Sequence, residues 1–367
     1  MRVAVVGCGL IGAAVARELQ LRGAQTVVYE ARHPGAGTSG TTFAWINSHD
    51  KEPRAYHDLN VAGMTAHLEL QTERRGKRRW LFPTGNLVWA DDHAGVERLA
   101  RRVERLAAWD YPLEQLTPAA ATDLEPALRI GGGVDRVLLF PSEGHVLPGV
   151  LLDRLLGEAL ERGAELRCPV RVDRITLAVR GITVHLAEGF SDKADVAVCC
   201  AGRWSSELLS PAGFSMPLVD SETPGSTARG LLAYTRPTTI QLGRLLTSPR
   251  LNVRPDGEGR LTLQALDLDT TADPANGSEF LRRLAEVLNG ADRVELEEVR
   301  VGQRVIPRDG LTVAGHLDVG GSLYAIATHS GVTLAPLLGR IAAREIVDGS
   351  PDPVLEPFRP QRFDDAT

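Results

Sequence analysis

The sequence predicts an α/β fold joined to an α+β region: a parallel sheet with helices packed on it, and a second, mainly antiparallel part. Two observations lead to this prediction. An apolar strand-length run at 2–6, a helical segment at 13–21 and a second strand at 26–29 follow one another at the N-terminus, and this order builds a parallel sheet. Between 216 and 303 the pattern changes to short strands separated by turns, which is typical of hairpins and antiparallel pairing.

Apolar spacing predicts the remaining elements in order. Helices are expected over about 52–73, 95–109, 117–124, 151–160, 280–288 and 334–347. Strands are expected over about 86–89, 137–140, 165–170, 182–186, 194–200, 229–235, 251–254, 261–264, 293–301 and 323–328.

Composition limits the class of protein. The chain has 367 residues, 43% of them hydrophobic and 24% charged, which suits a globular protein with two domains or one large one. The net charge of -6 argues against broad nucleic-acid affinity. No apolar run approaches the roughly 20 residues that span a bilayer, and Arg17 and Glu18 interrupt the apolar start, so we expect a cytoplasmic protein. The four cysteines show neither metal spacing nor a disulfide framework.

The turn between the first strand and helix carries the motif Gly-x-Gly-x-x-Gly at Gly7–Gly12. Gly7 permits the tight turn, Gly9 lets the backbone approach a pyrophosphate, and Gly12 lets the helix lie against the strand. The helix N-terminus then offers free N–H groups to phosphates. Because strand, glycine motif and helix occur in this order, the segment predicts a dinucleotide-binding site.

An acidic residue and a glycine-rich loop extend the motif. Glu30 closes the second strand 18 residues after Gly12, where an acid meets the ribose hydroxyls. It disfavours NADP, and it leaves NAD and FAD open. The following segment, 31–42, is rich in glycine and hydroxyl residues, so it can wrap a ligand with backbone amides. Within it, Arg32 could lie beside an adenine or a phosphate.

The glycine motif, Glu30 and Gly37-Thr38-Ser39 leading into a second helix resemble the D-amino-acid oxidase superfamily, which includes glycine oxidase, sarcosine oxidase and small D-amino-acid dehydrogenases. The resemblance extends across nearly the whole chain. It implies a discontinuous, Rossmann-like FAD-binding domain and a discontinuous, mainly antiparallel substrate-binding domain. The FAD-binding domain is expected to comprise 1–82, 143–215 and 304–367, and the substrate-binding domain 83–142 and 216–303.

The motifs and the resemblance together predict the FAD contacts. In the family, the residue matching Val170 holds the adenine through its backbone, and the turn matching 201–204 passes close to the flavin, which small residues permit. The helix after 329–333 presents its N-terminus to the pyrimidine side of the flavin. The predicted contacts are Gly7, Gly9, Leu10, Ile11, Gly12, Glu30, Ala31, Arg32, Gly37, Thr38, Ser39, Thr42, Phe43, Ala44, Val170, Ala201, Gly202, Trp204, His329, Ser330, Gly331, Val332 and Thr333. No metal is expected.

The resemblance implies oxidation of the C–N bond of an amino acid or secondary amine to an imine, by hydride transfer to flavin N5. Such a reaction needs a cation for the substrate carboxylate, and arginine binds one bidentately. Arg304 matches the family arginine, although an arginine near a proline also suits a surface ion pair. Tyr234 could donate to the same carboxylate or simply pack in its strand. His329 and His49 could touch flavin or substrate.

The sequence departs from the family pattern in two respects. The turn after His329 is shorter, and it lacks the arginine that glycine oxidase carries there, so glycine is not favoured as the substrate. Val305 replaces a proline that often follows the family arginine. No cysteine lies in the segment where sarcosine oxidase links its flavin, so we expect FAD to be bound without a covalent bond.

Three alternatives remain open from the sequence. An NAD-dependent imine reductase or dehydrogenase would share the first motif but not the Thr38-Ser39 loop or the turn at His329. A flavin-dependent tailoring enzyme for a bulkier amine, or a non-catalytic FAD-binding subunit, would share all of them. The expected partners are a small amine or amino acid and O2 or another electron acceptor. We expect no nucleic acid and no integral membrane segment, and an oligomer is possible.

Overall fold

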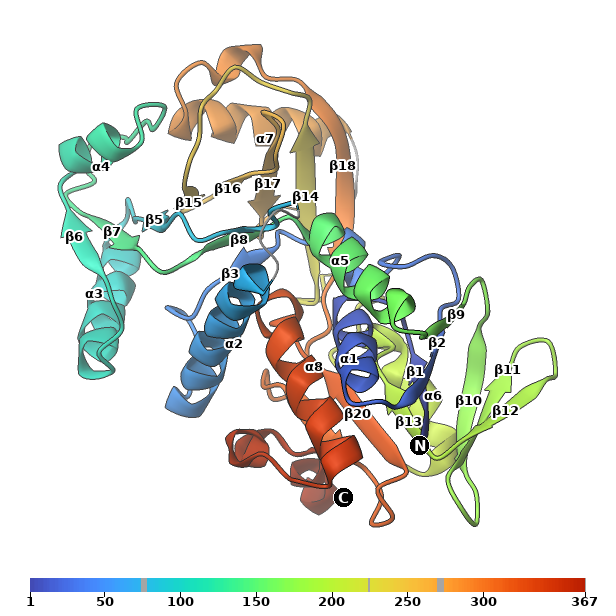
Figure 1. Cartoon of the computed structure of the whole chain (residues 1–367). Coiled ribbons are helices and arrows are strands. Elements are labelled where there is room, and N and C mark those ends of the chain that lie inside the picture. The colour runs from blue at the N-terminus through green and yellow to red at the C-terminus, as the bar shows by residue number, and fades with distance from the viewer. Residues whose placement is uncertain (74–77, 224, 269–273, 367) are drawn as a thin grey trace.

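The computed structural model describes residues 1–73, 78–223, 225–268 and 274–366. It contains two large sheets, shown in Figure 1 with the eight-stranded sheet above the six-stranded one. The six-stranded sheet has the order β19-β20-β13-β1-β2-β9 and is parallel except for β19, which runs antiparallel to β20. Its strands are β1 (Arg2–Val6), β2 (Gln25–Tyr29), β9 (Glu165–Arg167), β13 (Val196–Cys199), β19 (Val313–His316) and β20 (Leu323–Ala327).

Both faces of this sheet are covered, so β1 is apolar without alternation, as expected of a central parallel strand. Val3 and Val5 belong to a core cluster with four helices, and Ala4 and Val6 belong to a cluster on the other face. The helices are α1 (Leu10–Leu21), α2 (Arg54–Thr72), α5 (Pro148–Glu161) and α8 (Gly331–Asp348). The other face carries α6 (Ser205–Leu209) and an antiparallel sheet of β10 (Val172–Leu177), β11 (Ile182–Leu186) and β12 (Ser191–Ala194).

The eight-stranded sheet has the order β18-β14-β17-β16-β15-β5-β7-β6 and is antiparallel except for the pair β15–β5. Its strands are β5 (Asn86–Val88), β6 (Glu114–Leu116), β7 (Val137–Phe140), β14 (Arg229–Thr235), β15 (Leu245–Thr247), β16 (Asn252–Pro255), β17 (Leu261–Ala265) and β18 (Leu296–Gln303). Helix α7 (Pro274–Val287) buries Phe280 and Leu284 in its core, and α3 (His93–Ala108) and α4 (Pro118–Leu124) lie near β6 and β7 (Figure 1).

A small sheet, β3-β8-β4, is formed by β3 (Trp45–Ile46), β8 (Gly144–Val146) and β4 (Leu81–Phe82). Six 3-10 helices complete the described structure: η1 (Thr38–Gly40), η2 (Gly202–Trp204), η3 (Ser210–Ala212), η4 (Ala291–Arg293), η5 (Pro353–Phe358) and η6 (Pro360–Ala366). Among the described residues, no helix is both long and apolar enough to cross a bilayer.

The predicted fold class is confirmed. The sequence did not indicate β3, β4, β6, β12, β15 or β19, because strands of two to four residues carry little periodicity. It did not indicate the six-residue strand β10 either. The strand predicted over 165–170 ends at Arg167, since Pro169 has no N–H to donate to a ladder. Helix α7 begins six residues earlier than predicted, at Pro274 rather than at Phe280.

Candidate active site

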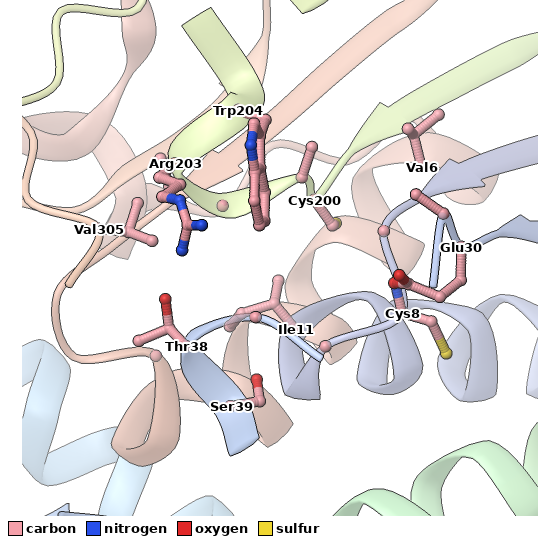
Figure 2. Close-up of a pocket in the computed structure, with 18 of the residues that line it drawn as sticks. Val6, Cys8, Ile11, Glu30, Thr38, Ser39, Cys200, Arg203, Trp204 and Val305 are labelled. Atoms are coloured by element: carbon pink, nitrogen blue, oxygen red, sulfur yellow. The ribbon is translucent and has the colours of Figure 1, made fainter. Parts of the chain in front are cut away.

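A cavity of about 610 Å³ lies where the central parallel strands end (Figure 2). Val6, Tyr29, Cys200 and Ala327, which end or follow β1, β2, β13 and β20, all line it. Ligands of open parallel sheets bind outside the carboxyl ends of the strands, because the strand-to-helix turns converge there. The cavity therefore occupies the expected position for a dinucleotide.

The glycine motif shapes one wall of the cavity. Gly7 has φ of 101°, which favours glycine. A Cβ at Gly12 would stand 1.9 Å from the carbonyl oxygen of Gly7, so only glycine lets helix α1 begin this close to the turn. Gly12 does not line the cavity, whereas Gly7, Gly9, Leu10 and Ile11 do. Gly12 therefore packs the start of helix α1 against the turn, as predicted, and does not itself face the cavity.

Side chains already bind several amides of this wall. The carboxylate of Glu30 accepts hydrogen bonds from the N–H of Cys8 and the N–H of Arg32, each at 2.9 Å. The hydroxyl of Ser39 accepts from the N–H of Leu10 at 3.0 Å. Glu30 is therefore held at the end of β2, on the cavity wall, with its carboxylate oriented by backbone donors.

Most of the predicted FAD contacts line this cavity. The lining residues among them are Gly7, Gly9, Leu10, Ile11, Glu30, Ala31, Arg32, Gly37, Thr38, Ser39, Thr42, Val170, Ala201, Gly202, Trp204, His329, Gly331 and Val332. Phe43, Ala44, Ser330 and Thr333 are not among the residues that line the cavity. The hydroxyl of Ser330, for example, is 2.8 Å from the hydroxyl of Tyr56, and the Phe43 carbonyl accepts from Arg254 Nε.

His329 is the one predicted catalytic residue that lines the cavity. Burial, followed by the nearby positive charges of Lys51 and Arg304, lowers the pKa of His329 to about 4. Its imidazole is therefore neutral at physiological pH. Lys51 Nζ pairs with Asp50 Oδ1 at 2.8 Å. Burial alone would lower the pKa of Lys51, but the charge of Asp50 holds this pKa above its ordinary value.

Arg304 lies beside the cavity, next to Val305, which lines it. Its Nη2 donates to the Thr227 carbonyl, and its Nε has no hydrogen-bond partner among the described residues. Burial lowers the pKa of Arg304, and no carboxylate of the described residues opposes that shift. The guanidinium of Arg304 is thus a partly buried cation, and no carboxylate among the described residues serves as its counter-ion.

Tyr234 and His49 do not line the cavity. Tyr234 lies on β14, packs with a cluster containing Phe43 and Leu232, and has Arg300 over its ring at 5.2 Å. Burial raises the pKa of Tyr234 to about 12. The ring of His49 stacks on Phe140 at 4.4 Å between ring centroids. Its hydrogen bonding is directed to Glu143 rather than to the cavity.

The sequence reasoning missed Arg203, which lines the cavity between the predicted contacts Gly202 and Trp204, and it missed the pair Asp50–Lys51. Arg203 could have been predicted to line the cavity, because it lies between two predicted contacts in the turn at Gly202–Trp204. No local pattern indicates Lys51, because its electrostatic effect on His329 arises between segments 278 residues apart. Within the described chain, no group of acidic, histidine or cysteine side chains is arranged to hold a metal ion.

This parallel sheet, with a glycine turn, an acid at the end of β2 and a cavity across the strand ends, defines a dinucleotide-binding protein. The family model described as "FAD dependent oxidoreductase" (DAO) matches residues 2–345, so the chain belongs to this family. FAD is its cofactor, and the NAD-dependent alternative is set aside. The cavity suits FAD because the Glu30 carboxylate can also accept from ribose hydroxyls, and the first-turn N–H groups of α1 can meet a diphosphate.

Individual relatives are distant but match over nearly full length. The chain is 24% identical to glycine oxidase of Geobacillus kaustophilus (strain HTA426), over 93% of this chain and 91% of that one. It is 25% identical to a subunit of the opine oxidase of Agrobacterium tumefaciens (strain Ach5), over 98% and 96% of the two chains. The crystal structure of the Geobacillus kaustophilus glycine oxidase superposes with a TM-score of 0.86 at 22% identity, covering 98% of each chain, which establishes the shared fold.

Proposed function

We propose that this FAD-dependent oxidoreductase oxidises the C–N bond of an amino acid or a carboxylate-bearing secondary amine to an imine. Water then hydrolyses the imine. When bound, FAD supplies the two-electron acceptor that takes the hydride from the substrate carbon. The names of the relatives, a glycine oxidase and an opine oxidase, support an amine that carries a carboxylate.

The single observation that carries the proposal is the state of Arg304. A partly buried guanidinium without a described carboxylate partner is unfavourable unless a ligand supplies the anion. An amino acid carboxylate supplies that charge, and the planar donor fork can bind it through two hydrogen bonds. The contact of Arg304 with the Thr227 carbonyl orients the fork. In this reading Arg304 binds the substrate and fixes the position of its Cα–H.

His329 complements this role as a neutral group on the cavity wall. With a pKa of about 4, it adds no positive charge that would compete with Arg304 for the carboxylate. We assign Tyr234 to the roof of the substrate pocket and His49 to a positioning role through Glu143. The domain division predicted from the sequence is retained in this proposal: residues 83–142 and 216–303 roof the flavin, and Arg304 lies where the chain returns to the FAD-binding domain.

The test uses the purified holoenzyme under anaerobic conditions with a panel of amines. The panel contains glycine, D-alanine, sarcosine, L-proline and an N-carboxyalkyl amino acid, each paired with its decarboxylated counterpart. We expect the visible absorbance of oxidised flavin to be lost with at least one carboxylate-bearing member. Parallel assays of O2 uptake and of an artificial acceptor distinguish an oxidase from a dehydrogenase. A flavoprotein that no amine reduces would contradict the proposal and favour a non-catalytic role.

Variants of Arg304 identify the carboxylate ligand. Arg304→Ala should raise the KM for the best amino acid by roughly 100-fold, because truncating one partner of a buried charge pair costs several kcal/mol. It should leave the decarboxylated amine unaffected, and Arg304→Lys should restore part of the difference. Arg308→Ala, an exposed arginine four residues away, is the matched control. Equal losses for the acid and its decarboxylated counterpart would remove Arg304 from the proposed role.

A further inference from the structure

Arg203 points into the FAD cavity from the wall opposite helix α1. It follows β13 in the turn that η2 forms at Gly202–Trp204, and Figure 2 shows its guanidinium directed into the cavity, toward Thr38 and Ile11. The guanidinium carbon lies 3.9 Å from the ring centroid of Trp204, so the neighbouring indole holds it in a stacked orientation. The side chain is therefore presented to the ligand rather than to solvent.

The charge of Arg203 is poorly compensated by the described chain. Its ion pair with Glu222 has an Nε–Oε1 distance of 4.0 Å, and the Glu222 side chain is 73% exposed, so water screens the interaction. Burial lowers the pKa of Arg203, and the nearby charge of Arg32, which also lies over Trp204 at 5.4 Å, lowers it further, against the effect of Glu222. Two guanidinium groups thus share one wall of the cavity, and an anion bound there would neutralise their charge.

The opposite wall offers fewer donors than the glycine motif suggests. The N–H groups of Cys8 and Leu10 are occupied by Glu30 and Ser39. The amides that remain, those of Gly9 and of the first turn of α1 from Ile11 onward, carry only a partial positive charge. A full positive charge would strengthen the binding of a diphosphate, which carries two negative charges, and Arg203 directs its guanidinium into the same space from across the cavity (Figure 2).

We propose that Arg203 binds the diphosphate of FAD from the side opposite helix α1. The diphosphate then lies between the backbone amides of the glycine turn and the guanidinium that stacks on Trp204. The proposal rests on FAD being the cofactor and adds a residue that fixes it. Trp204 acts as a positioning residue, since its ring holds the guanidinium over the cavity.

The experiment measures equilibrium binding to the apoprotein by quenching of flavin fluorescence, and by calorimetry for ADP. Arg203→Ala should weaken FAD and ADP by a similar factor, about 10- to 100-fold, as expected for loss of a charge-assisted hydrogen bond. Riboflavin, which has no phosphate, should bind both proteins equally. Raising the salt concentration should weaken FAD binding less in the variant than in the parent protein.

Two further variants keep the test decisive. Arg203→Lys retains the charge without the planar stack, and it should lose less affinity than Arg203→Ala. Arg174→Ala, an exposed arginine on β10 outside the cavity, controls for the change in net charge and should bind FAD normally. Unchanged FAD affinity in Arg203→Ala, or equal losses for FAD and riboflavin, would overturn the proposal. A parent protein that binds no FAD would instead refute the cofactor itself.

Discussion

The imidazole Nδ1 of His49 lies 2.8 Å from Oε2 of Glu143, and both side chains are almost completely buried. Glu143, in the turn between β7 and β8, also accepts from the N–H groups of Ser48 and His49 and from the hydroxyl of Tyr111. Burial alone would raise the pKa of Glu143, but the charge and hydrogen bonds of His49 hold it below its ordinary value. This carboxylate therefore joins the loop after β3 to the end of the eight-stranded sheet.

Replacing Glu143 with glutamine should lower the free energy of unfolding by about 3 kcal/mol, because a buried donor set loses its anion. Urea unfolding monitored by tryptophan fluorescence measures this loss. Glu104→Gln, at an exposed position on α3, is the control and should change stability by less than about 0.5 kcal/mol. A variant as stable as the parent protein would contradict the prediction and show that the carboxylate charge of Glu143 does not contribute to the free energy of unfolding.

Gly12 is expected to tolerate no side chain at all. Gly12→Ala would place a Cβ 1.9 Å from the carbonyl oxygen of Gly7, and the start of α1 must shift to relieve this contact. We expect both a loss of stability of a few kcal/mol and a loss of FAD binding. Gly157→Ala in the interior of α5, where a Cβ meets nothing within 4 Å, should instead stabilise the protein by up to about 1 kcal/mol. Thermal unfolding with and without added FAD compares the two substitutions.

Spacing along the chain indicates an arrangement best where the residues concerned lie near one another in the sequence. Gly7, Gly12 and Glu30 fall within one strand-helix-strand unit, so spacing alone indicated their arrangement. The pair His49–Glu143 joins residues 94 positions apart, and β15 pairs in parallel with β5 about 160 residues earlier. Such contacts depend on how the two sheets meet, which no local period encodes. The charge of Lys51 near His329 was missed for the same reason.

His67 should contribute to loss of stability in mild acid. Its Nε2 lies 2.8 Å from the Val332 carbonyl, and burial lowers the pKa of His67 from 6.5 to about 4. Between these values the unfolded chain binds a proton that the folded chain excludes, so the free energy of unfolding falls as pH falls from about 6.5 to 4. One such group contributes roughly 3 kcal/mol across that range.

His67→Gln removes this titration and should reduce the slope of unfolding free energy against pH between about 6.5 and 4. The slope should not vanish, because other histidines titrate in the same way. Burial lowers the pKa of His145 to about 3 and that of His329 to about 4. Urea titrations at several pH values give the slope. The same slope in parent and variant would place the acid sensitivity outside His67.

Release of FAD from the denatured protein tests whether the cofactor is bound without a covalent link. A thioether to flavin requires a reactive thiolate, and the cysteines that line the cavity are Cys8 and Cys200. Burial, followed by the charge of Glu30, raises the pKa of Cys8 to about 12, and burial also raises that of Cys200. Both thiols therefore stay protonated, and acid precipitation should leave all of the flavin in the supernatant, where its absorbance is measured. Flavin that stays with the pellet, and loses this attachment in Cys8→Ser or Cys200→Ser, would show instead that one of these thiols is activated when FAD binds.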